Sequence, residues 1–103
     1  MKRNLKQGLT SKITGRHYDI GTEVEVSFDN GQALLHFPDG QTVKTRAFRL
    51  HAIVTGFAKP PATITLHRWS LDGVCKTVTG YKVEPDGIGP DGSPSWLLAL
   101  GLI

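Results

Sequence analysis

The stretch Glu23–Phe37, EVEVSFDNGQALLHF, decides the fold of this chain. Its first half alternates polar and apolar side chains, which is the period of a half-buried β-strand. Asn30-Gly31 follows, and this dipeptide suits a two-residue hairpin turn because both of its positions need a positive φ. With such a turn, Val26 lies opposite Leu35, and the apolar residues of the two strands share one face. The sequence therefore predicts a β-hairpin at the centre of the fold.

A second corner, Pro38-Asp39-Gly40, leads the chain out of this hairpin, with proline and glycine at the positions that a tight turn favours. Alternating or β-branched segments recur beyond it, and Ser93-Pro94-Ser95 precedes a short apolar run as a helix start does. The further elements that we expect are strands over 41–50, 52–57, 62–69 and 74–84, the last two forming a hairpin, and a helix over 94–100.

Together these elements predict an all-β fold, a five- to six-stranded bent antiparallel sheet or half-open barrel with a short C-terminal helix. Residues 1–20 are expected to form a basic, partly flexible arm, and residues 21–103 a single β-rich domain. The residues that we expect on the inner face are Val24, Val26, Phe28, Leu35, Phe37, Val43, Ile53, Ile64, Leu66, Trp96, Leu97 and Leu100.

Composition limits the class of protein. The formal charge of the 103 residues is +3, but residues 1–17 carry five basic side chains and no acid, so the rest is slightly acidic. The longest apolar run, Trp96–Ile103, is too short for a bilayer, which needs about 20 residues in a helix. One cysteine allows no internal disulfide. We therefore expect a soluble, cytoplasmic protein without a membrane partner.

Catalytic and metal-binding patterns are weak in this sequence. Cys75 with His51 or His67 has the residue types of a cysteine hydrolase, but their spacing carries no signature, and a buried, inert thiol is the expectation. The four histidines are widely separated and form no metal-binding pair. The sequence predicts no enzyme, no cofactor, no metal site and no small-molecule substrate.

Nucleic acid is one candidate partner, because several basic residues with an aromatic neighbour, Phe48, lie close together in the chain. Carboxylates from the same strands, such as Glu23 and Glu25, would oppose phosphate binding. The candidate residues are Lys44, Arg46, Arg49 and His51, with Lys2, Arg3, Lys6, Lys12 and Arg16 of the leader.

Protein is the other candidate partner, because the C-terminus is rich in large apolar side chains. If part of it stays exposed, it suits a homodimer or a different protein; the alternative is a helix folded back onto the sheet. The candidate interface residues are Trp96, Leu97, Leu100, Leu102 and Ile103.

The segments YKVEPDG (residues 81–87) and PDGSPSWLLALGLI (residues 90–103) resemble the C-terminal end of small uncharacterised proteins encoded by bacteriophages and other bacterial mobile elements. The resemblance implies a short accessory protein that binds a macromolecule of the host or the element, including inhibitors of host defence. It implies no site residues. We therefore expect a non-enzymatic binding protein whose partner is nucleic acid or protein.

Overall fold

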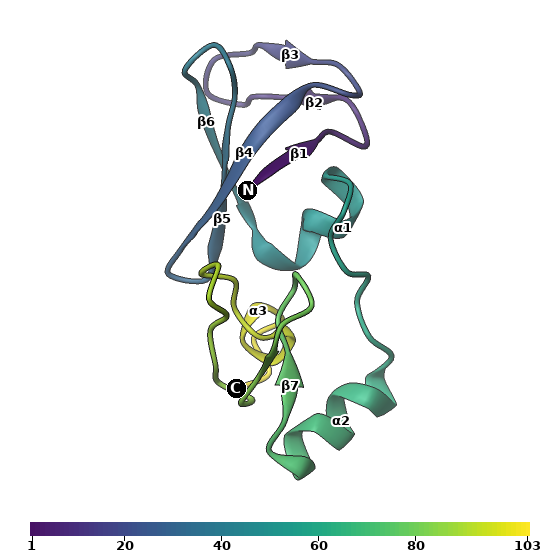
Figure 1. Cartoon of the computed structure of the whole chain (residues 1–103). Helices are drawn as coiled ribbons and strands as arrows, with labels where there is room; N and C mark the ends of the chain where they lie inside the picture. The colour runs from purple at the N-terminus through teal and green to yellow at the C-terminus, as the bar shows by residue number, and fades with distance from the viewer.

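The computed structural model describes residues 1–103 and shows two lobes stacked end to end (Figure 1), with overall extents of 43 × 21 × 21 Å. The amino-terminal lobe (residues 1–57) holds a sheet, and the carboxy-terminal lobe (residues 58–103) holds short helices and loops. Strands outnumber helices, and the sheet does not close into a barrel. None of the helices combines the length and the apolar character needed to cross a bilayer.

The predicted central hairpin is confirmed. It consists of β4 (Glu23–Asp29) and β5 (Gln32–His36), with Val26 opposite Leu35. Asn30 and Gly31 both have positive φ, 51° and 78°, as this turn requires. β6 (Thr42–Arg46) pairs with β5 as the third strand of the meander.

The leader completes this sheet and is not a separate arm. β1 (Lys2–Asn4) pairs with β4, giving the order β1-β4-β5-β6. β2 (Leu9–Thr10) and β3 (His17–Tyr18) form a small hairpin of their own. Leu5 is 1% exposed, and the Tyr18 ring stacks on Phe37 with 3.8 Å between centroids. Burial of these apolar side chains stabilises the packing of residues 1–20 against the lobe. The leader has no alternating strand pattern from which this burial could have been predicted.

The predicted strand over 52–57 is wrong. After β6 the chain forms a 3₁₀ turn, η1 (Ala47–Arg49), and a short helix, α1 (Leu50–Ile53), and Val54 then makes a single bridge with Leu5. Leu50, Ile53, Val54 and Phe57 are all buried, the first two within α1 and the last two after its end, where Val54 is extended.

The predicted strand over 62–69 is also wrong, because α2 (Thr63–Asp72) is a helix that ends at Gly73 in the left-handed conformation, φ 71°. Residues two apart lie on the same side of a strand but about 200° apart on a helix. Leu66 is therefore buried while Ile64, expected in the core, is 70% exposed.

The remainder of the carboxy-terminal lobe is built from very short elements. β7 (Cys75–Lys76) pairs with β8 (Lys82–Val83), not with the 62–69 segment. The predicted C-terminal helix is confirmed as α3 (Trp96–Ala99), where the Ser95 hydroxyl accepts the Leu98 N–H at 3.1 Å.

Each lobe contains one cluster of buried apolar side chains, and Phe28 packs against both clusters. Ala47 of η1 belongs to the carboxy-terminal cluster, so the lobes share apolar contacts at their junction. Of the twelve residues expected inside, Phe28, Val43 and Leu100 are half-buried and Ile64 is exposed. The eight that are buried as expected are Val24, Val26, Leu35, Phe37, Ile53, Leu66, Trp96 and Leu97.

Candidate functional site

Three exposed basic side chains follow one another along the chain in the edge strand β6 and in η1, and we call Lys44, Arg46 and Arg49 the basic strip. Lys44 and Arg46 share one face of β6, with Cα atoms about 6.6 Å apart from the rise of a strand. Arg49 follows in η1, where its guanidinium carbon lies 5.9 Å from the centre of the Phe48 ring. None of the three has an ion-pair partner within the molecule.

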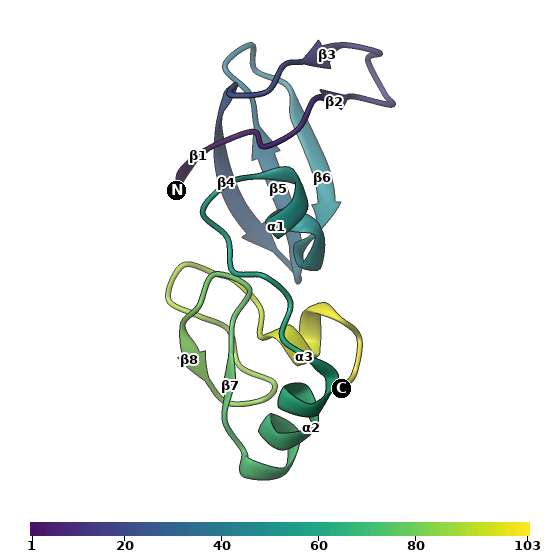
Figure 2. The same ribbon diagram turned by 90° about the vertical axis from the view of Figure 1, so that its right-hand side faces the viewer.

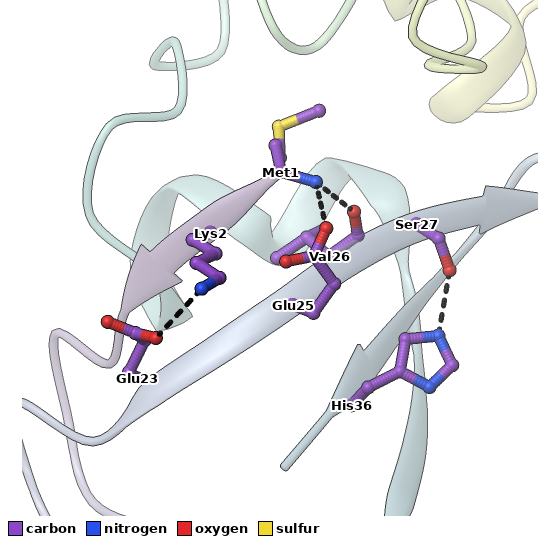
Figure 3. Close-up of polar contacts among 7 residues, drawn as sticks. All are labelled: Met1, Lys2, Glu23, Glu25, Val26, Ser27 and His36. Carbon is purple, nitrogen blue, oxygen red and sulfur yellow. Dashed lines mark hydrogen bonds and ion pairs between the residues drawn. The ribbon is translucent and has the colours of Figure 1, made fainter. Parts of the chain in front are cut away.

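The carboxylates that were expected to repel phosphate are largely neutralised (Figure 3). Glu23 lies 3.8 Å from the Lys2 ammonium, and Glu25 lies 2.6 Å from the Met1 ammonium. The hydrogen bond from this terminal ammonium, opposed by desolvation, lowers the pKa of Glu25. Across the sheet, Ser27 and His36 pair at 2.9 Å.

Asp39, in the turn between β5 and β6, is neutralised in the same way. Its carboxylate lies 3.0 Å from the Arg16 guanidinium and accepts the Tyr18 hydroxyl at 2.8 Å. The Gln41 backbone N–H, the Tyr18 hydroxyl and Arg16 together lower the pKa of Asp39 despite some desolvation. The amino-terminal lobe thus has eight lysines and arginines and five acidic side chains. Asp19 lies 3.4 Å from His17, and Asp29 has no basic partner.

The other predicted basic residues do not join the strip. Lys2 and Arg16 are held in ion pairs, and Arg3 faces the opposite side of the sheet. His51 donates from Nδ1 to the Phe48 carbonyl at 2.8 Å, and its ring meets Trp96 edge-on, which is a structural role. The two remaining leader residues, Lys6 and Lys12, are exposed in loops outside β6 and η1.

The residues considered for catalysis make no hydrogen bonds with one another. Cys75 is fully buried and its thiol donates to the Lys76 carbonyl at 3.3 Å. His67 is exposed on α2, and His17 pairs with the Thr10 hydroxyl at 2.9 Å. No three metal-ligating side chains come together.

Apolar side chains do gather on one surface of the carboxy-terminal lobe. Of the predicted interface residues, Trp96 and Leu97 are buried and Leu100 is half-buried, whereas Leu102 and Ile103 are each 56% exposed. These last two line a hollow of about 250 Å³ against α2. Sequence reasoning missed two other exposed apolar side chains of α2, Ile64 (70% exposed) and Leu71 (73%), which do not line this hollow, because a strand was expected there.

No known protein family, curated protein or solved structure matches this chain. The resemblance of its C-terminal segment to phage and mobile-element proteins therefore stays a prediction.

Proposed function

We propose that this chain is a non-enzymatic binding protein that holds nucleic acid on the basic strip. The observation that carries the proposal is a difference in pairing on the amino-terminal lobe. Three of its five carboxylates have a cationic partner, whereas Lys44, Arg46 and Arg49 have no acidic one. Unpaired surface cations attract phosphates, and binding is driven by release of the counterions that the phosphates hold.

Binding of this kind contacts the backbone and does not read the sequence. Lys44 and Arg46 project at the spacing of alternate strand residues, which is close to the distance between neighbouring phosphates of an extended strand. Phe48 is half-buried and packs into the carboxy-terminal cluster, so its ring is not a free stacking platform. We expect weak sequence preference and strong salt dependence. The setting that we propose, from the C-terminal resemblance, is an accessory protein of a phage or mobile element.

A pair of matched triple variants tests the proposal. Replacement of the strip, Lys44→Gln, Arg46→Gln and Arg49→Gln, removes three positive charges; the control removes three exposed lysines of the other lobe, Lys59, Lys76 and Lys82. Fluorescence anisotropy with labelled 20-nucleotide DNA measures the affinity from 50 to 200 mM salt. Three phosphate contacts give a slope of log K against log salt of about −2.7 for duplex DNA and about −2.1 for a single strand. For duplex DNA, this slope corresponds to a loss of affinity of about 40-fold over this salt range.

We expect the strip variant to lose this binding and the control to keep it. An equal loss of DNA affinity in both variants would show that net charge alone governs the binding. No binding of the unmodified protein at 50 mM salt would end the proposal.

A second candidate function is association with protein through the exposed apolar surface of α2 and the tail. Ile64 and Leu71 lie two helical turns apart, so two copies related by a two-fold axis can each place one against the other. Multi-angle light scattering of the protein and of Ile64→Asp tests for such a homodimer. A monomer at 100 µM, with Leu100→Asp also unchanged in mass, would rule the homodimer out.

A further inference from the structure

Arg3 occupies a position at which a strand normally carries an apolar residue. It lies opposite Val24 in the β1–β4 pair, and Val24 faces the core of the amino-terminal lobe. Its neighbours Lys2 and Asn4 are exposed on the other face of the sheet. A half-buried guanidinium on the inner face is costly unless a partner satisfies it.

The side chain of Arg3 is held in place by its surroundings. Its guanidinium carbon lies 5.6 Å from the centre of the Phe57 ring. Gly56 has a φ of 89°, and a Cβ on this glycine would lie 3.2 Å from Cδ and Nε of Arg3. The backbone of Gly56 therefore packs directly against the side chain of Arg3.

Within the molecule, Arg3 lacks the partner that its position demands. Its Nε is the one buried side-chain nitrogen or oxygen without a hydrogen bond, and no carboxylate forms an ion pair with it. Buried polar groups are satisfied in nearly all native proteins, so an exception of this kind calls for an explanation. A ligand cannot reach Nε itself, but the two terminal nitrogens of the guanidinium also make no hydrogen bond and are accessible, so an anionic group can pair with them.

Arg3 borders a hollow of about 300 Å³ at the junction of the two lobes. Met1 lines it from β1, and Thr79, Gly80, Tyr81 and Asp91 line it from the carboxy-terminal lobe. In Figure 2 the start of β1 lies above the loops of that lobe. Tyr81 is 47% exposed, and its hydroxyl makes no hydrogen bond.

Asp91 is the acidic group of this hollow. Its carboxylate accepts the Thr79 hydroxyl at 2.7 Å and the Ser93 N–H at 3.0 Å, as well as the Ser93 hydroxyl. Desolvation opposes ionisation, but these hydrogen bonds outweigh it and lower the pKa of Asp91. A carboxylate has about four acceptor positions, so one remains free for a donor on a ligand.

We propose that this hollow binds a nucleoside monophosphate, free or as the phosphorylated end of a strand. The phosphate pairs with the guanidinium of Arg3, whose planar fork matches two phosphate oxygens. The base stacks on the Tyr81 ring. A sugar hydroxyl or a base amine donates to Asp91. The volume is at the lower end of the range for small-molecule pockets, and the charge of Asp91 disfavours a bare phosphate ion, which brings no such donor.

Titrations of residues 1–103, without an added N-terminal tag, test this proposal. Isothermal titration calorimetry and ¹H–¹⁵N spectra would use AMP, CMP, adenosine and inorganic phosphate, and then one oligonucleotide with and without a 5′-phosphate. We expect AMP or CMP to shift the amide signals of Arg3, Tyr81 and Gly80 and to bind more tightly than adenosine or phosphate. Preference for the phosphorylated oligonucleotide over the free nucleotide would identify a strand end as the source, and the reverse a free nucleotide.

Variants connect the binding to the named groups. Arg3→Gln should weaken nucleotide binding about 10- to 100-fold, since a charge-assisted hydrogen bond is lost, with little effect on adenosine. Tyr81→Ala should weaken both, and because Tyr81 lies at the surface this variant tests the site even if Arg3→Gln unfolds. Lys82→Gln, on β8 next to Tyr81, is the control.

The triple variant of the basic strip should bind the nucleotide normally, which separates this site from the proposed nucleic-acid surface. Equal affinity for inorganic phosphate and AMP, an unchanged affinity in both Arg3→Gln and Tyr81→Ala, or no shift of these signals at 10 mM nucleotide would each overturn the proposal.

Discussion

Leu5→Ala measures how far the leader supports the fold. The Leu5 side chain is 1% exposed within the apolar cluster of the amino-terminal lobe, and its backbone N–H donates to the Thr22 carbonyl at 2.9 Å. Alanine keeps this backbone bond, so the change isolates the side chain. Truncation of a fully buried leucine costs about 3–5 kcal/mol from lost burial and the cavity left behind. This is a large share of the stability of a domain, about 5–15 kcal/mol.

Urea unfolding followed by far-ultraviolet circular dichroism provides the assay. With an m-value of about 1.5 kcal/mol per molar, the midpoint should fall by about 2–3 M. Ile13→Ala is the matched control, because Ile13 lies in the same leader and is 91% exposed. This substitution should lower the free energy of unfolding by less than about 0.5 kcal/mol. If Leu5→Ala shifts the midpoint no more than Ile13→Ala does, residues 1–20 do not pack into the lobe.

Three further predictions follow from packing and charge. Phe28→Ala should lower the free energy of unfolding by about 1.5–3 kcal/mol, less than the loss for a fully buried phenylalanine. It should also separate the urea transitions seen by tryptophan fluorescence and by circular dichroism, because Phe28 packs against both clusters. Coincident, unshifted transitions would contradict this role. The Cys75 thiol should react with Ellman's reagent only through opening of the protein, so stoichiometric labelling within seconds in native buffer would show that it is not buried. Folding lowers the pKa values of Glu25 and Asp39, so the stability that these carboxylates add is complete above their ordinary pKa values and is lost as pH falls through the lowered ones. The urea midpoint should therefore drop between about pH 5 and pH 3. A midpoint that stays constant over this range would refute this linkage.

Sequence pattern was sufficient where the determinants are local. The Asn30-Gly31 turn and the alternation of β4 each act over a few residues, and both are observed as predicted. The C-terminal helix is also present, but it begins at Trp96 with Ser95 as its cap, two residues after the predicted start at Pro94. The register of the hairpin follows from the turn, because a two-residue loop leaves one pairing of the flanking residues. The face that carries Lys44 and Arg46 was therefore predictable as well.

Propensity misled the prediction in the middle of the chain. Thr63, Ile64 and Thr65 favour strands, yet they begin α2, where burial of Leu66 and Trp69 against the carboxy-terminal cluster outweighs a preference worth less than about 1 kcal/mol per residue. Residues 52–57 have no regular period in the structure, because α1 ends at Ile53 and Val54 is extended, so the sequence pattern had little to predict there.

The sequence by itself determined the central meander, the capped C-terminal helix and the surplus of positive charge on the amino-terminal half. Only the tertiary structure decided that β1 joins the sheet, because the pairing of Lys2–Asn4 with Glu23–Glu25 depends on contacts more than eighteen residues apart that no local pattern encodes. It likewise decided which charges remain free. Ion pairs form between segments distant in sequence, such as Arg16 with Asp39, and so leave Arg3 and the basic strip without partners.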